Sequence, residues 1–98
     1  MKNKISNNNN DDLINVINPG EKILSAQFIS SDQKLIYSIP CKNTTTFVRV
    51  EEKLYEEYPE YKEFHTYFTV GGIMIYRFKN MEDNKIKDGV KIMLCYDE

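Results

Sequence analysis

The chain has 98 residues, of which 41% are hydrophobic and 29% are charged, and its net charge is −2. A chain of this length makes at most one small domain, whose core can form without metals or disulfides. The slight acidic balance argues against broad nucleic-acid binding, which needs a basic face, although a local basic patch is still allowed.

The cysteine and histidine content argues against a metal site. Cys41 and Cys95 lie far apart, no CxxC pair occurs, and His65 is the sole histidine. Zinc-ligand spacing is therefore absent. We expect two reduced thiols that behave as small apolar groups; a disulfide or a reactive thiol is the alternative.

Targeting signals are also absent from the sequence. The N-terminus lacks the apolar stretch of a signal peptide, and no run approaches the length that spans a membrane. We therefore expect an intracellular protein, cytoplasmic or nuclear, with no membrane partner.

Residues 1–20 differ in composition from the rest of the chain. Residues 7–10 are four consecutive asparagines, and such a polar segment buries too little apolar surface to offset its ordering entropy. We predict a disordered arm over residues 1–20 and a domain over residues 21–98. One apolar cluster precedes the turn at Pro19-Gly20, and it either lies against its own domain or docks on a partner; it consists of Leu13, Ile14, Val16 and Ile17.

A β-hairpin is predicted after this turn. Residues 22–29 alternate in hydrophobicity, and residues 34–42 form a second run rich in branched and aromatic side chains. Pro40 has no amide hydrogen for a strand ladder, so it suggests an edge position or a bulge. The side chains predicted to face the core are Leu24, Ala26, Phe28, Tyr37, Ile39 and Cys41.

The next segment predicts an amphipathic helix over residues 46–57. Phe47, Val50 and Leu54 recur at spacings of three and four, which places them on one helix face. The threonines before the helix are candidate N-caps, and Pro59 should end it at or before the preceding residue. Charged residues are expected on the other faces; they are Arg49, Glu51, Glu52, Lys53, Glu56 and Glu57.

A third strand is predicted over residues 67–70, with Phe68 and Val70 facing inward. Gly71-Gly72 should make a tight turn, because glycine tolerates a positive φ. Residues 73–78 should begin a short strand.

The chain should close with a crossing segment and a last strand. Residues 81–86 are expected to form a helical turn or loop anchored by Ile86, and Asp88-Gly89 marks the next turn. Residues 90–95 then alternate, with Ile92 and Leu94 inward.

This order of elements resembles the ubiquitin-like β-grasp family over about residues 21–96. The most specific part is Ile86-Lys87-Asp88-Gly89 with the alternating strand that follows, and the stripe in residues 47–54 is similar to the inward helix positions of the family. The resemblance implies an α+β fold in which a four- to five-stranded mixed sheet packs on one main helix.

The resemblance also implies where family functions would reside. Tyr96-Asp97-Glu98 stands where a conjugation tail would begin, and Gly71-Gly72 lies inside the fold, so we expect a non-conjugated protein. Ile73 occupies a turn position that carries lysine in ubiquitin. The apolar recognition patch of the family corresponds to Thr69, Met93 and Cys95, with Tyr67 beside them; an ordinary exposed sheet face is the alternative.

A second set of candidates lies at the end of the predicted helix. Residues 55–61 contain three acids and three tyrosines, Tyr55, Tyr58 and Tyr61. We favour a solvated helix end with tyrosines folded onto the core. An acidic aromatic surface for a basic partner is the alternative, because tyrosine is favoured at interfaces.

We predict a protein without enzymatic activity, cofactor or metal. No phosphate loop, nucleophile elbow or HExxH motif occurs, and inward Cys41 and outward Cys95 argue against a cysteine–histidine nucleophile. The predicted function is a protein-interaction module that binds a protein partner reversibly through the sheet face.

The candidate contact residues are Tyr67, Thr69, Met93 and Cys95, followed by Tyr55, Tyr58, Tyr61, Leu13, Ile14 and Ile17. The alternative function is a structural subunit fixed in a larger complex through the N-terminal arm and the sheet edge at Pro40.

Overall fold

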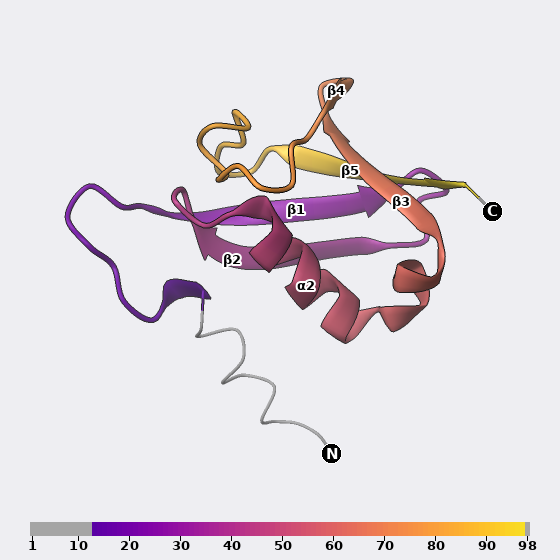
Figure 1. Cartoon of the computed structure of the whole chain (residues 1–98), viewed down its shortest axis with the longest axis horizontal. Helices are drawn as coiled ribbons and strands as arrows, with labels where there is room; N and C mark the ends of the chain where they lie inside the picture. Colours follow the sequence, from indigo (N-terminus) through magenta and orange to yellow (C-terminus); the bar gives the residue numbers. More distant parts are fainter. Residues whose placement is uncertain (1–12, 98) are drawn as a thin grey trace, which may run out of the picture.

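The structure is a computed structural model that describes residues 13–97, the last of them by its backbone alone. Within these residues a mixed sheet packs on one main helix, so the predicted α+β architecture is confirmed (Figure 1). The elements are β1 (Ile23–Ser30), β2 (Ile36–Lys42), α2 (Phe47–Glu57), the 3-10 helix η1 (Pro59–Glu63), β3 (His65–Val70), β4 (Ile73–Met74) and β5 (Lys91–Asp97).

The sheet is mixed because its two adjacent strands β1 and β5 run parallel. The strand order is β2-β1-β5-β3-β4, and the other neighbouring pairs are antiparallel. β2 is thus an edge strand, as Pro40 suggested. The amide of Asn43 donates to the carbonyl of Lys22 at 3.0 Å, so this is a hydrogen-bonded pair of the antiparallel ladder. Hydrogen-bonded and non-hydrogen-bonded pairs alternate from there, and the pair of Pro40 with Ser25 is a non-hydrogen-bonded one, in which the backbone of Pro40 points away from β1. The missing amide hydrogen therefore costs the ladder nothing.

Three phenylalanines form the centre of the core between the sheet and α2. The ring centroid of Phe68 on β3 lies 5.7 Å from that of Phe28 on β1 and 5.1 Å from that of Phe47 on α2. The predicted inward positions are confirmed, with Tyr37 and Val70 only partly buried. Those that are fully buried are Leu24, Ala26, Phe28, Ile39, Cys41, Phe47, Val50, Leu54, Phe68, Ile86, Ile92 and Leu94.

Backbone carbonyls, rather than a side chain, cap the first turn of α2. Thr46 occupies the N-cap position, but its side chain makes no capping hydrogen bond, so the expected threonine cap does not form. The amides of Phe47 and Val48 instead donate to the carbonyls of Lys79 and Arg77, both at 2.9 Å. These bonds satisfy two of the amides that every helix leaves without an internal partner.

Two of the charged residues predicted on the other faces of α2 are buried there, which the helix pattern did not indicate. Glu51 is 3% exposed and Lys53 is 8% exposed, counting backbone and side chain together. Glu51 is buried because Arg77 and Tyr55 hydrogen-bond its carboxylate. The side chain of Lys53 is 10% exposed, and its ammonium lies 3.7 Å from a carboxylate oxygen of Glu56.

β4 is shorter than the strand predicted over residues 73–78. Beyond β4, the amide of Ile75 still donates to the carbonyl of Phe68 at 2.9 Å. The side chain of Asn84 then accepts from the amide of Tyr76 at 2.8 Å and donates to its carbonyl at 2.9 Å. Because Asn84 occupies both backbone groups, the chain leaves the sheet at this point.

Residues 1–12 of the predicted arm lie outside the described residues. Leu13 is 3% exposed and belongs to the core, and Ile14 packs partly against it. Val16 and Ile17 are exposed, but the ammonium of Lys42 donates to the carbonyl of Val16 at 2.7 Å. Of the two alternatives for this cluster, Leu13 therefore follows the first and lies against its own domain.

Two carboxylates tie the ends of the β-hairpin to their surroundings. Asp32 accepts from the hydroxyls of Ser30 and Tyr96, each at 2.6 Å, and these bonds hold the pKa of its carboxyl at about 2. Glu21 accepts from the hydroxyl of Thr44, the amide of Asn18 and the ammonium of Lys42, which also hold its pKa at about 2.

These two pKa values predict loss of stability in acid. Their ordinary values are 3.8 for Asp32 and 4.5 for Glu21, so the unfolded chain binds more protons than the folded chain as the pH falls from about 5 to 2. The free energy of unfolding should be constant above this range and decrease within it. Urea unfolding across the range measures this, and Asp32→Asn should flatten the slope. Asp83→Asn is the control, and an equal effect of both variants would contradict the assignment.

The burial of Leu13 predicts that this residue stabilises the domain. Leu13→Ala should lower the free energy of unfolding by about 2–4 kcal/mol, because it leaves a cavity in the core. Val16→Ala, at a position 62% exposed, should change it by less than about 0.5 kcal/mol. Equal effects in chemical denaturation would show that residues near Leu13 do not pack on the domain.

Candidate functional site

The structure brings the four predicted contact residues together on the open face of the sheet, the face that α2 does not cover. In the antiparallel β3–β5 pair, Tyr67 lies opposite Cys95 and Thr69 lies opposite Met93. The residues between them face the core, so these four point outward. Tyr67 is 40% exposed and Met93 is 37% exposed, whereas Thr69 and Cys95 are half-buried.

A row of side chains, apolar except for Thr69, continues this surface across all five strands. Along one line of pairing, Ile36 on β2 meets Ile29 on β1, Ile29 meets Met93 on β5, Met93 meets Thr69 on β3, and Thr69 meets Met74 on β4. We call these five residues the open-face row. At the usual strand spacing the row is about 19 Å long. Ile36 is 74% exposed and Met74 is 57% exposed.

Sequence reasoning missed three members of the open-face row. The alternation of residues 22–29 implies that Ile29 faces outward, but nothing local shows which residues of the other strands lie beside it. That information is in the register of the β1–β5 pair, which joins segments about sixty residues apart. Ile36 and Met74 therefore became candidates only through the structure.

The secondary tyrosine candidates are held in the fold. Tyr61 is 8% exposed, and the ring of Tyr58 lies edge-on to that of Tyr37 with centroids 5.2 Å apart. The hydroxyl of Tyr55 donates to Glu51 at 2.8 Å. The structure thus places these rings as the favoured interpretation expected, on the core and its margin.

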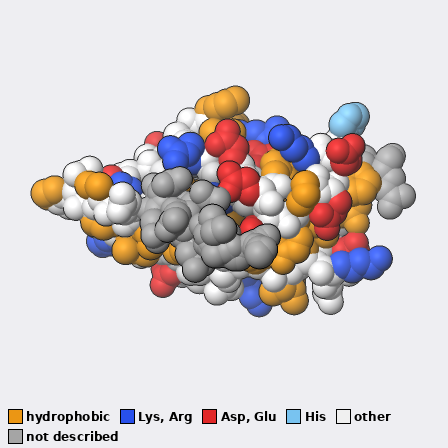
Figure 2. Space-filling view, turned by 90° about the horizontal axis from the view of Figure 1, so that it is seen from below, with side chains coloured by type: hydrophobic (Ala, Val, Ile, Leu, Met, Phe, Trp, Pro, Cys, Tyr) orange, Lys and Arg blue, Asp and Glu red, His pale blue; other side chains and the backbone are white. Residues whose placement is uncertain are grey.

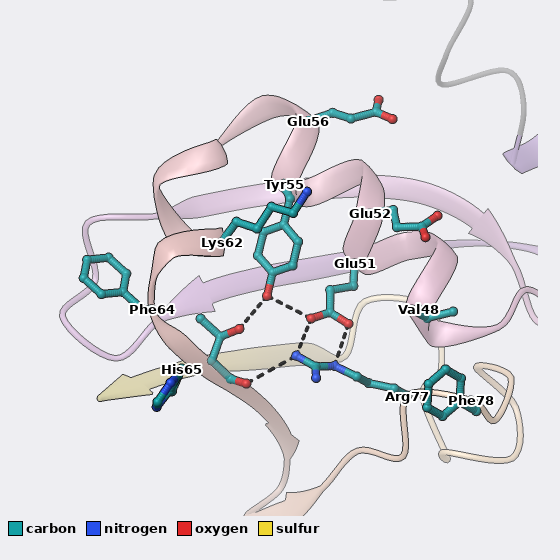
Figure 3. A pocket seen from close by; sticks show the side chains of 11 residues that line it. Val48, Glu51, Glu52, Tyr55, Glu56, Lys62, Phe64, His65, Arg77 and Phe78 are labelled. Carbon is teal, nitrogen blue, oxygen red and sulfur yellow. Dashed lines mark hydrogen bonds and ion pairs between the residues drawn. The ribbon is translucent and has the colours of Figure 1, made fainter. Parts of the chain in front are cut away.

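An ion pair forms the floor of a groove between α2 and β3 (Figure 3). The two oxygens of the Glu51 carboxylate accept from Nε of Arg77 at 2.8 Å and from its Nη2 at 2.6 Å. The hydroxyl of Tyr55 bridges Glu51 and the hydroxyl of Thr66, and Nη2 of Arg77 also donates to the carbonyl of Thr66 at 3.3 Å. Loop, helix and strand are joined at this point.

The pKa values of Arg77 and Tyr55 are both raised in this network. The hydrogen bonds with Glu51 raise the pKa of the Arg77 guanidinium above its ordinary value. Burial raises the pKa of Tyr55 to about 12, so at neutral pH its hydroxyl keeps the proton that it donates. The network is therefore a structural joint whose polar groups already have partners.

The two cysteines have different surroundings. Cys41 is fully buried on the core side, and burial raises the pKa of its thiol to about 12, so it stays protonated at neutral pH. Cys95 is half-buried on the open face, and both thiols are free. Within residues 13–97 no hydrogen bond joins His65 to either cysteine, and no group of three metal-ligating side chains forms.

Surface charge is mixed on the face seen from below in Figure 2. Acidic, basic and hydrophobic side chains are interspersed there, and no broad basic area is visible. In the part of the chain that is described, none of the helices has the length and apolar character needed to cross a membrane.

Comparison with solved structures shows a ubiquitin-like fold. A de novo designed protein based on ubiquitin matches with a TM-score of 0.65 and 18% identity, over 83% of this chain and 94% of that chain. The ubiquitin of Caldiarchaeum subterraneum matches with a TM-score of 0.65 and 15% identity, over 79% of this chain and 96% of that one. The ubiquitin-like domain of tubulin-binding cofactor B matches with a TM-score of 0.59 and 10% identity, over 78% of this chain and 91% of that one.

No protein-family model and no curated protein sequence matches this chain. These three structural matches are below 25% identical, and they cover most of the described domain. The chain therefore has the ubiquitin-like β-grasp fold that its sequence resembles.

The ion pair between Glu51 and Arg77 predicts that substitutions of its two members lower stability by different amounts. Arg77→Met leaves a buried carboxylate without its counterion and should lower the free energy of unfolding by about 3 kcal/mol. Glu51→Gln keeps a hydrogen-bond acceptor and leaves an Arg77 side chain that is 44% exposed, so it should cost only about 1 kcal/mol. Urea unfolding at pH 7 gives both values. The reverse order would show that Glu51 is not the buried partner.

Proposed function

We propose that this domain is a protein-interaction module that binds its partner reversibly through the open-face row. The observation that carries the proposal is an exposed apolar row across the sheet in a protein whose core is already complete on the other face. Apolar side chains that stabilise no core contact, gathered on one face, mark interaction surfaces. The ubiquitin-like fold supports the same class of function.

The residue types of the row favour an adaptable contact. Met74 and Met93 are unbranched and polarizable, so they can fit partners of different shape. Thr69 lies between them and carries a hydroxyl that needs a hydrogen-bond partner when the surface is covered. A partner that supplies an acceptor or donor opposite Thr69 would be preferred over one that is wholly apolar.

The size of the row suggests a transient complex. Five residues over about 19 Å form the centre of a small interface, with Tyr67 and Cys95 on one side. Interfaces at the lower end of the size range belong to weak and signalling contacts. Reversible docking is therefore the mode that we propose.

The proposal includes that the domain acts without being conjugated. Gly71 and Gly72 hold φ angles of 57° and 82° in the turn between β3 and β4, where they serve the fold. A thioester between this chain and an activating enzyme would contradict this part of the proposal.

Affinity capture with matched variants tests the open-face row. Wild type, Met93→Asp and Phe78→Asp are immobilised, and bound proteins from native extract are quantified by mass spectrometry. Met93→Asp should reduce capture of the specific partners at least tenfold, because a charge would be buried in the contact. Phe78→Asp should not, although Phe78 is 83% exposed, because it lies off the open face.

Thermal unfolding of both variants provides the control for folding. Retained capture by Met93→Asp, with a normal melting temperature, would refute the open-face row as the binding site. The alternative function, a fixed structural subunit, predicts that the chain migrates in a salt-resistant complex in size-exclusion chromatography of extract. The outer edge of β2, interrupted by Pro40, offers few donors for such an attachment.

A further inference from the structure

A cavity lies at the opposite end of β1 from the open-face row. It is open to solvent on one side, has a volume of about 630 Å³ and is lined by the start of β1, Asn43, Glu82 and residues 85–88. Leu24 and Ile86 contribute buried apolar surface to it, being 6% and 2% exposed, and Ile23 beside them is 53% exposed. The cavity has the size of sites that hold small ligands or a few residues of peptide.

Three lysines line this cavity, Lys22, Lys85 and Lys87. Within residues 13–97, none of their ammonium groups takes part in an ion pair or a side-chain hydrogen bond. The two acids of the lining are already engaged. Asp88 accepts from the amide of Ser25 at 2.7 Å, and Glu82 accepts from the side-chain amide of Asn43 at 2.8 Å.

Lys85 also has an uncommon backbone conformation. Lys85 holds a φ of 64°, in the left-handed region of backbone conformation that residues other than glycine and asparagine rarely adopt. It occupies the residue after the end of a helical turn, in a Schellman motif. The amide of Lys85 donates to the carbonyl of Glu82, and the amide of Ile86 donates to that of Met81, both at 2.9 Å.

Folding alone would favour glycine at this position. A non-glycine residue held in such a conformation costs conformational free energy, and residues of this kind cluster at binding sites. Among residues 13–97 the ammonium group of Lys85 has no ionic partner, and it lies at the rim of a cavity with two further lysines. Lys85 is therefore a candidate for binding as well as for the turn.

We propose that this cavity binds an acidic peptide segment that carries an apolar side chain. Its carboxylates would pair with Lys22, Lys85 and Lys87, and its apolar side chain would lie against Leu24 and Ile86 beside Ile23. Charge complementarity supports this occupant, because three lysines and two hydrogen-bonded carboxylates give the lining a charge of 3 − 2 = +1 around an apolar floor, in a protein whose net charge is −2. This binding surface is separate from the open-face row.

The test uses the full chain and a fluorescein-labelled peptide of eight alternating glutamate and leucine residues. Fluorescence anisotropy at low salt should show saturable binding that weakens as salt is added. Lys22→Gln, Lys87→Gln and Lys85→Gly should each weaken it about two- to fivefold, and the triple variant by about tenfold or more. Lys34→Gln, at an exposed lysine in the β1–β2 turn, should leave it unchanged.

Lys85→Gly separates binding from folding. Because glycine relieves the positive φ, this variant should raise the melting temperature by a few degrees while it weakens the peptide. A lower melting temperature together with weaker binding would indicate damage to the fold and refute the role assigned to Lys85.

Three further measurements decide the chemistry of the occupant. A peptide with serine in place of leucine should bind at least threefold more weakly, and the Ile86 and Leu24 methyl signals should shift with the leucine peptide. Equal binding of both peptides, or unshifted methyls, would refute the apolar contact. Tighter binding of inorganic polyphosphate would refute a peptide occupant in favour of a polyanion. Met93→Asp should leave peptide binding unchanged. The test of the cavity can therefore fail without refuting the open-face row, and the reverse also holds.

Discussion

The two hydrogen bonds from the first amides of α2 to the carbonyls of Arg77 and Lys79 are the contact on which the rest of the structure depends. They fix the crossing segment against the helix, and they bring the side chain of Arg77 to Glu51. Glu51 orients Tyr55, which reaches Thr66 on β3. A backbone cap thus aligns helix, loop and strand, and it explains how a carboxylate is buried without destabilising the core.

The same crossing segment determines how much of the sheet is left uncovered. Because Asn84 holds the backbone of Tyr76 away from β3, β4 ends at Met74, whose outward side chain is 57% exposed. α2 covers only the other face. An alternating strand with one covered face must present its second set of side chains to solvent, and here the register aligns five of them into the open-face row.

Patterns that are local in sequence could be predicted, and features that depend on distant partners could not. Alternation predicted the inward residues of β1 and β5, helical spacing predicted Phe47, Val50 and Leu54, and Gly71-Gly72 predicted the tight turn. The burial of Glu51 was not predicted, because its partner Arg77 lies 26 residues away. The open-face row could not be predicted without the register of β1 with β5. The predicted contact residues Tyr67, Thr69, Met93 and Cys95 lie on β3 and β5 and cover only one part of this face.

Lys22 and Ile29 lie seven residues apart on and beside β1, so the lysine-lined cavity and the open-face row are separated by roughly 23 Å. A small interface covers one of these surfaces and leaves the other free. The two surfaces also differ in chemistry, since the row is apolar and the cavity is basic above an apolar floor. A partner with an apolar element joined to an acidic tail would engage both, and the second contact would then form at a high effective concentration. Weak surfaces on a small domain can in this way give a specific complex.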